Sequence, residues 1–323
     1  MTATDAGPAP ARTTASGPRI GIALPQELRD REPAGAAIAR YARRAERLGF
    51  DGLWTQESVR GAAPTLEPLT LLAAVAGVTS RVELGVATVL SAYRSPIQLA
   101  RATASLDALS GGRLVLGVAL GERGLEDGFG MPAGSRVRRF VEGIELLRHL
   151  WSEDRVTWSG EIGRLVGWPT GLRPVQPGGP RLLIGGHHPR ALARAVSLGD
   201  GWVGAGGQSI AQFLDDLRIV RELLDGRPEA RPFETGKRVY LAVGRRRADD
   251  RRRLREWFGR RQGDPDRADR VAIASDAAGL VEALRPLVAA GTDRLILSPL
   301  FDERRQLETI AADVMPYLRP GER

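Results

Sequence analysis

Short apolar or β-branched runs alternate with longer stretches of helical periodicity from residue 19 almost to the C-terminus. The runs predict eight strands, at residues 19–24, 52–55, 81–89, 113–118, 181–184, 202–203, 238–243 and 294–297. The helical stretches lie at residues 34–48, 67–78, 95–109, 135–151, 189–197, 209–224, 249–258, 277–290 and 303–315. Strands that alternate with helices over about 300 residues indicate a parallel α/β fold.

Eight strands are the number that closes a (β/α)8 TIM barrel, and the chain length suits such a barrel with insertions. An open doubly wound sheet is the alternative, but its glycine-rich turn after the first strand is missing: the sequence there is Leu24-Pro25-Gln26-Glu27. We therefore predict one barrel domain over residues 18–323. Residues 1–17 are rich in Ala, Thr, Pro and Gly without periodicity, so we expect a disordered leader.

Two long irregular stretches interrupt the predicted barrel. Residues 119–134 follow the fourth strand, and residues 153–179 follow the fourth helix. Both are longer than plain connections. We expect them to be insertions near the active face that shape the substrate pocket, with Phe129, Trp158 and Trp168 as candidate wall residues.

Composition removes several classes of chemistry. The chain has no cysteine and three histidines, so disulfides, thiolate metal sites and cysteine nucleophiles are excluded, and no metal site is expected. No apolar run has the roughly 18 residues of a membrane helix, and no signal-peptide core is visible. We expect a cytoplasmic protein without a membrane partner.

The net charge of +8 raises the question of nucleic-acid binding. All but one of the 47 Lys and Arg residues are arginines, the exception being Lys237, and they are spread along the chain. Aromatic residues make up only 5% of the sequence. A nucleic-acid surface needs clustered basic residues with interleaved aromatic ones, so we expect no nucleic-acid partner.

Barrel enzymes carry their sites on the loops after the strands, and two of these loops are rich in small residues. One is Gly185-Gly186-His187-His188, followed by a proline suited to the first turn of a helix; the other contains Gly204, Ala205 and Gly206. Glycines let a phosphate approach backbone N–H groups at a helix start. The pattern predicts a phosphate site, and the alternative is that these glycines only make tight turns.

Glu57 and Glu122 each follow a predicted strand. A carboxylate on the rim of a barrel is a candidate general acid or base if burial raises its pKa. The alternative is an ordinary solvated loop carboxylate.

Four stretches, in this order and spacing, resemble the bacterial luciferase-like family of flavin- and deazaflavin-dependent oxidoreductases. They are residues 41–54, ending in Leu-Gly-Phe-Asp-Gly-Leu-Trp, residues 79–96, residues 105–118 with Leu-Ser-Gly-Gly-Arg-Leu, and residues 173–202, ending in Gly-Asp-Gly-Trp. The resemblance covers residues 19 to 315.

This resemblance implies a TIM barrel that holds the flavin or deazaflavin ring in its mouth, with the cofactor phosphate on Gly185 and Gly186. It implies a bulge and a non-proline cis peptide at about Ala87–Thr88, against which the ring lies. A homodimer is expected by analogy. Two features bear on the cofactor. Ser58 stands where many deazaflavin users carry a histidine, which argues against a deazaflavin dehydrogenase. Glu122 lies where some deazaflavin dehydrogenases keep a proton-donating glutamate, which argues for one.

Three functions follow. The first hypothesis is a monooxygenase that uses reduced FMN and oxygen on a small organic substrate, with a separate flavin reductase as a partner. The second is an oxidoreductase that transfers a hydride with the deazaflavin coenzyme F420, for which a positioned acid such as Glu122 is useful. The third is a non-catalytic flavin-binding barrel.

Overall fold

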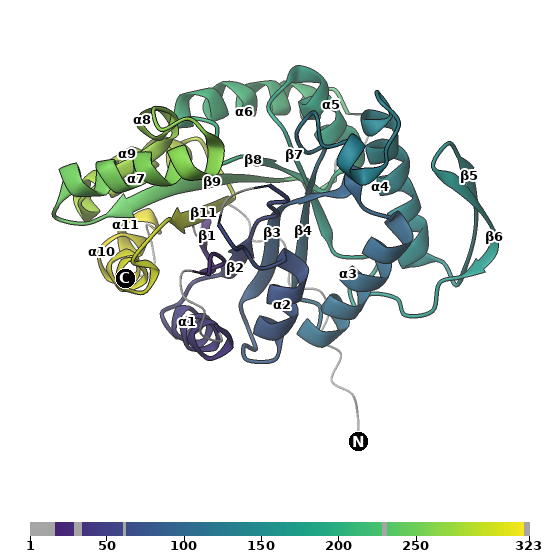
Figure 1. The fold of residues 1–323 in the computed structure, drawn as a ribbon, viewed down its shortest axis with the longest axis horizontal. Coiled ribbons are helices and arrows are strands. Elements are labelled where there is room, and N and C mark those ends of the chain that lie inside the picture. The colour runs from purple at the N-terminus through teal and green to yellow at the C-terminus, as the bar shows by residue number, and fades with distance from the viewer. Residues whose placement is uncertain (1–16, 29–33, 61–62, 228–230, 320–323) are drawn as a thin grey trace.

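The protein is a closed barrel of parallel strands surrounded by helices (Figure 1). The computed structural model describes residues 17–28, 34–60, 63–227 and 231–319. The leader predicted at residues 1–17 lies outside these ranges except for Gly17. Within the described chain, no helix combines the length and apolar character needed to span a bilayer.

The eight predicted strands are confirmed, and they form the barrel. In spatial order they are β1 (Arg19–Ala23), β2 (Gly52–Thr55), β3 (Glu83–Leu90), β4 (Leu114–Ala119), β7 (Arg181–Gly185), β8 (Gly201–Gly204), β9 (Glu234–Val243) and β11 (Arg294–Pro299). All neighbours pair in parallel, and β11 pairs with β1 to close the ring.

The predicted helices are also present. They are α1 (Gly35–Arg47), α2 (Pro68–Ala76), α3 (Pro96–Ser110), α4 (Arg136–Ser152), α5 (Pro189–Leu198), α6 (Ile210–Asp225), α7 (Arg247–Gln262), α9 (Ala277–Ala289) and α10 (Glu303–Asp313). Ser95 and Ser209 cap α3 and α6 through their hydroxyl groups, as side chains of this type favour. A short helix, α11 (Met315–Leu318), follows α10.

The insertion at residues 153–179 is not at the active face, so that expectation was wrong. It forms a two-stranded hairpin, β5 (Arg155–Gly160) and β6 (Gly163–Pro169), on the far side of α4 from the barrel (Figure 1). Its base is fixed near the end of α4, where the Thr170 hydroxyl donates to the carbonyl of Glu153 over 2.7 Å. A loop that follows a helix leaves from the amino ends of the strands, so Trp158 and Trp168 do not line the barrel mouth.

A helical extension covers one side of the mouth. It consists of α7, α8 (Arg267–Val271) and β10 (Ala272–Ser275), which pairs with the upper half of β9. The extension packs on the barrel rim through an apolar cluster: Leu254, Trp257, Phe258 and Ala268 against Tyr240, Ala242, Leu300 and Phe301. This cluster leaves the ends of β3, β4, β7 and β8 as the open part of the mouth.

Charged groups plug the opposite, amino end of the barrel. Arg294 is fully buried and donates to Glu234 over 2.5 Å and to Glu83 over 2.6 Å. Glu83 also accepts from Arg19 over 2.7 Å and from Arg181. Burial alone would raise the pKa of Glu83, but Arg294, Arg181 and Arg19 outweigh it and lower that pKa to about 2.

The indole of Trp54 lies above this plug, packed with Val115, Leu183, Val203 and Ile296. Trp54 is 1% exposed and lies across the interior, with the guanidinium carbon of Arg294 at 4.9 Å from its ring centroid. A Cβ atom at Gly21 would come within 2.3 Å of the indole, and one at Gly85 within 2.4 Å. The glycines on the neighbouring strands therefore make the room that Trp54 occupies.

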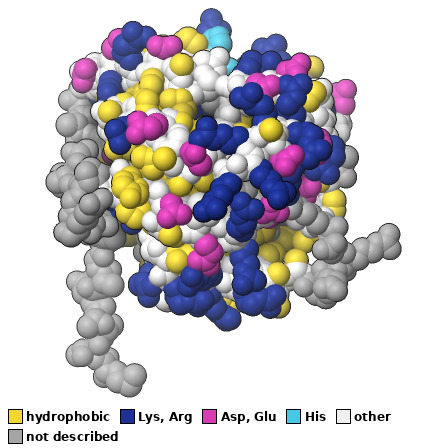
Figure 2. Space-filling model, turned by 90° about the vertical axis from the view of Figure 1, so that its left-hand side faces the viewer, with side chains coloured by type: hydrophobic (Ala, Val, Ile, Leu, Met, Phe, Trp, Pro, Cys, Tyr) yellow, Lys and Arg dark blue, Asp and Glu magenta, His cyan; other side chains and the backbone are white. Residues whose placement is uncertain are grey.

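Basic side chains on the outer surface are interspersed with acidic ones, as Figure 2 shows for the face that carries α7 and α10. Several form ion pairs, among them Arg253 with Asp302 and Arg44 with Glu308. These arginines are thus paired locally, although basic side chains outnumber acidic ones on this face.

We expect Glu83→Gln to lower the free energy of unfolding by about 3–5 kcal/mol, because it leaves buried guanidinium groups with too few carboxylates. Urea unfolding at pH 7 measures this, with the exposed Glu308→Gln as the matched control, expected to change stability by less than about 1 kcal/mol. The folded pKa of Glu83 is depressed, so its contribution is complete above about pH 4.5 and is lost as the pH falls towards 2. Equal losses for the two variants would contradict a structural role for the buried cluster.

Candidate active site at the barrel mouth

The loops singled out from the sequence converge at the carboxyl ends of the strands. The glycine loops follow β7 and β8, which are neighbours in the barrel, and the Ala87–Thr88 step lies in β3 beside β4. A Cβ atom added at Gly185 would lie 3.0 Å from Thr88 Cγ2 and 3.4 Å from Ala119 Cβ. The inner wall of the mouth is therefore built from small side chains on three adjacent strands, β3, β4 and β7.

The predicted cis peptide between Ala87 and Thr88 is present, and it lies in a β-bulge. The register of β3 against β4 shifts between Val86 and Val89, as expected for a bulge at this end of the strand. The Thr88 carbonyl then accepts from the Glu57 N–H over 3.3 Å, which joins the bulge to the end of β2.

The loop after β7 presents backbone N–H groups to the mouth. Gly186 has φ +151°, and a Cβ there would come within 2.7 Å of Ala191, so glycine is required. Its carbonyl accepts from the indole N–H of Trp202 over 2.7 Å, in the layer between the barrel and α6. Because C=O and N–H of a trans peptide point in opposite directions, the N–H of His187 points away from the Trp202 indole and α6. Within the described ranges it donates to no acceptor.

The loop after β8 is oriented by Lys237, which lies beneath it. The Lys237 amine is buried and donates to the carbonyls of Ala205 over 2.5 Å and Gln208 over 2.6 Å. Burial, with Arg238 next, lowers the pKa of Lys237 to about 7, and even a neutral amine has a donor for each carbonyl. By the same peptide geometry the N–H of Gly206 points away from Lys237, and it has no acceptor among the residues described here.

The two adjacent histidines occupy the start of α5. His188 is the N-cap, and its imidazole nitrogen accepts from the N–H of Arg190 over 3.2 Å. His187 is exposed beside it. At the end of β2, Ser58 donates to the carbonyl of Arg60 over 2.7 Å.

Glu57 is nearly buried and its carboxylate is fully engaged. It is 7% exposed, pairs with Arg94, whose Nε donates over 2.9 Å, and accepts from the N–H of Leu90 over 2.5 Å. This arrangement fixes the segment that leaves β3. Its predicted role as an acid or base stays a prediction, and the geometry describes a carboxylate that positions the bulge.

Glu122 lies on the rim with an exposed side chain. The loop around it is held by its backbone: the Glu122 carbonyl accepts from the Tyr93 hydroxyl over 2.6 Å, and the Gly121 carbonyl from Arg136 over 3.1 Å. Phe129 packs against Tyr93 with ring centroids 5.0 Å apart. The carboxylate of Glu122 has no hydrogen-bond or ionic partner in the described parts of the chain, so it is free to meet a ligand.

The floor of the mouth contains a residue that the sequence argument missed. Arg238 is 6% exposed, and its side chain reaches from β9 across the barrel to β3. Beside it, the Tyr240 hydroxyl donates to the side-chain oxygen of Gln56 over 3.2 Å. One signal was available for each missed residue: Lys237 is the only lysine, and Arg238 is a charge at the start of a predicted apolar strand.

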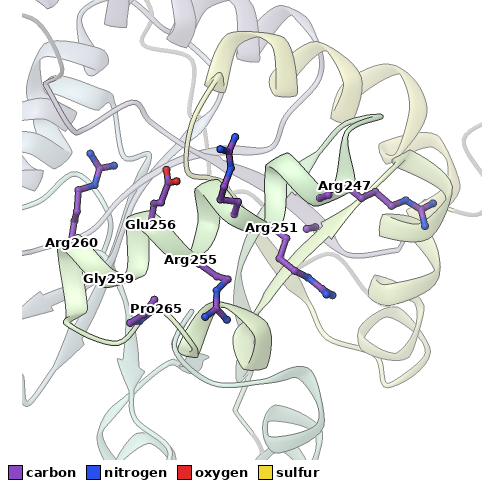
Figure 3. Close-up of a pocket in the computed structure, with 10 residues that line it drawn as sticks. Arg247, Arg251, Arg255, Glu256, Gly259, Arg260 and Pro265 are labelled. Atoms are coloured by element: carbon purple, nitrogen blue, oxygen red, sulfur yellow. The ribbon is translucent and has the colours of Figure 1, made fainter.

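A large open cavity elsewhere does not belong to this site. It has a volume of about 1120 Å³ and runs along the polar face of α7 (Figure 3). Arg247, Arg251 and Arg255 line it from successive turns, and they pair with Asp276, Asp269 and Asp266. These three arginines therefore already have carboxylate partners. In the described ranges, no three or more His, Asp or Glu side chains gather as metal ligands.

The sequence and the fold are similar to those of known oxidoreductases. The luciferase-like monooxygenase family profile matches residues 18–298. An F420-dependent glucose-6-phosphate dehydrogenase of Kineococcus radiotolerans is 30% identical over 322 residues, which cover 89% of this chain and 94% of that protein.

Two solved structures share the fold across both chains. One is an F420-dependent secondary alcohol dehydrogenase in complex with an F420–acetone adduct (TM-score 0.81, 18% identity, 94% of this chain and 99% of that one). The other is the monooxygenase RslO1 from Streptomyces bottropensis (TM-score 0.74, 24% identity, 93% and 99%). The chain therefore belongs to the luciferase-like monooxygenase family and is an oxidoreductase with a (β/α)8 barrel.

Proposed function

We propose that this protein is a coenzyme F420-dependent oxidoreductase that moves a hydride between the deazaflavin and the hydroxyl-bearing or carbonyl carbon of a small molecule. The support from sequence is the F420-dependent dehydrogenase that aligns over most of both chains. This favours the second of the hypotheses drawn from the sequence over the FMN monooxygenase. Membership in an oxidoreductase family removes the ground for a non-catalytic barrel.

The observation that carries the proposal is the pair of oriented N–H groups at the ends of β7 and β8. Trp202 and Lys237 hold the carbonyls of Gly186 and Ala205 away from the mouth, so the N–H groups that follow are available for a phosphate. These loops contain every glycine and histidine assigned to the phosphate from the sequence: Gly185, Gly186, His187, His188, Gly204 and Gly206. The residues present therefore fit a cofactor that carries a phosphate.

The chemistry of the hydride belongs to the deazaflavin when it is bound, and the chain supplies the setting. Small side chains at Ala87, Ala119 and Gly185 leave room for a flat ring against β3, β4 and β7. Glu122 is the carboxyl group on the rim that would handle the proton of the substrate hydroxyl.

A reduced-FMN monooxygenase is the second candidate, and one residue favours it. Ser58 occupies the position where many deazaflavin users have a histidine, and here its hydroxyl donates to a neighbouring carbonyl. Only in that case is a separate flavin reductase needed as a partner. A homodimer and a cytoplasmic location remain predictions under either candidate.

The cofactor is identified by titrating the purified protein with F420 and with FMN, each oxidised and reduced, and following fluorescence and heat. We expect F420 to bind in the micromolar range or tighter, and FMN at least about tenfold more weakly, a difference of about 1.4 kcal/mol. Tight binding of FMN alone, in its reduced form, would overturn the proposal in favour of the monooxygenase.

A charge placed on the second loop tests the phosphate site. Ala205 is exposed and already has a Cβ atom, so Ala205→Asp adds a carboxylate with little disturbance of the fold. We expect it to weaken cofactor binding by about tenfold or more through repulsion of the phosphate. Ala205→Asn has the same shape without the charge and should bind like the wild type. Similar affinities for the two variants would exclude a phosphate at this loop.

The Glu122→Gln variant distinguishes F420-dependent hydride transfer from the reduced-FMN monooxygenase reaction. General acid–base groups contribute about 10²- to 10⁴-fold, so we expect the substrate half-reaction with F420 to slow at least about 100-fold in a stopped-flow measurement. Asp127→Asn, an exposed carboxylate in the same loop, is the control and should retain the wild-type rate. An unchanged rate in the Glu122 variant would remove this residue from the mechanism.

A further inference from the structure

Arg238 spans the barrel at the floor of the mouth. In the ring of eight strands β9 and β3 are opposite each other, and the guanidinium of Arg238 joins them. Its Nη1 donates to the carbonyl of Ala87 over 3.1 Å, and its Nε donates to the Ser298 hydroxyl on β11 over 3.0 Å. The guanidinium carbon lies 5.1 Å from the centroid of the Tyr240 ring. A guanidinium group therefore lies across the barrel interior between β9, β3 and β11.

The charge of Arg238 has no carboxylate partner among the residues that the structure describes. Among the described residues no carboxylate lies within 4.0 Å of it, whereas the buried Arg294 two layers below has both Glu83 and Glu234. Burial lowers the pKa of Arg238; the Tyr240 hydroxyl opposes this effect and Arg261 adds to it. An unpaired buried ion costs several kcal/mol. A site that keeps one is suited to a ligand that brings the negative charge.

The third guanidinium nitrogen, Nη2, donates to no acceptor in the described chain, so Arg238 retains a donor for such a ligand. The neighbouring wall of Ala87, Ala119 and Gly185 has small side chains, which suits a flat ring rather than a branched chain. A hydride carries one negative charge with its electron pair. Adding it to a neutral flavin or deazaflavin ring therefore gives an anion, whose charge is delocalised over the ring nitrogen and oxygen atoms, and no proton has to leave.

We propose that Arg238 is the residue that binds the reduced, anionic ring of the cofactor in preference to the oxidised ring. This inference rests on the proposed function only in that a ring of this class occupies the mouth. On this proposal Arg238 sets the ratio of the affinities for the oxidised and the reduced cofactor. That ratio in turn sets the reduction potential of the bound cofactor. The hydrogen bond to Ala87 holds the bulge, whereas the charge discriminates between the forms.

Two variants separate charge from hydrogen bonding. Arg238→Gln removes the charge and keeps an amide donor at about the position of the arginine Nε, which bonds Ser298; Arg238→Lys keeps the charge and loses the planar set of donors. For each protein, the dissociation constants of the oxidised and reduced cofactor are measured anaerobically by fluorescence. We expect the preference for the reduced form to fall by about tenfold or more in Arg238→Gln, and to stay within about threefold in Arg238→Lys. If Arg238→Gln weakened the binding of the oxidised and the reduced cofactor equally, Arg238 would have only a structural role, and the proposal would be overturned.

A measurement on the wild-type protein covers the case in which Arg238→Gln does not fold. The absorbance of bound reduced cofactor is followed against pH and compared with that of the free cofactor. We expect the ring proton to be lost at least about one pH unit lower in the complex, because a nearby cation favours the anion. An unchanged or raised value would overturn the proposal.

The binding measurements distinguish a failure of the F420 assignment from a failure of the role proposed for Arg238. If FMN binds and F420 does not, the F420 assignment is wrong, and the same comparison is made with oxidised and reduced FMN. If neither cofactor binds the wild-type protein, both the proposed function and the role of Arg238 are overturned.

Discussion

The barrel depends on the way in which its interior is filled, and the decisive contact is the buried ion-pair cluster around Arg294. Glu83 on β3 and Glu234 on β9 come from opposite sides of the barrel, and Arg294 on β11 bridges them. Because each buried charge needs the others, these strands have a narrow choice of register. The cluster closes the amino end of the barrel and supports Trp54 above it.

The layers above this plug change in character towards the mouth. Trp54 requires glycines on its neighbours, and the next layer has Arg238 with Ser298 and the small residues of β3, β4 and β7. Two buried arginines therefore occupy the same barrel with different surroundings. Arg294 pairs with two carboxylates, whereas Arg238 has none within 4.0 Å among the described residues. The first arginine is thus part of a structural layer, and we propose a ligand as the partner of the second.

The mouth also shows how side chains behind the site control backbone groups within it. Trp202 and Lys237 touch the ligand-facing loops only through carbonyl oxygens, on the side away from the mouth. Since each peptide is planar, fixing its carbonyl fixes the N–H on the other side. Likewise Glu57 acts on the β3 bulge through Arg94 and the N–H of Leu90. Residues of this kind fix the backbone of the candidate site from behind it.

The sequence by itself determined the eight strands, the helices between them, the two glycine loops and the Ala87–Thr88 step, because these follow from local periodicity, turn chemistry and a recognisable family pattern. It did not determine what charged residues inside strands do. Arg238, Arg294 and Lys237 all lie in apolar runs, and only the register of the closed barrel decides which of them meets a carboxylate, a carbonyl or the mouth. The hairpin at residues 155–169 was misplaced for a different reason. It follows α4, and in a barrel of alternating strands and helices a loop after a helix lies at the amino ends of the strands, so the predicted order of elements already placed it away from the mouth.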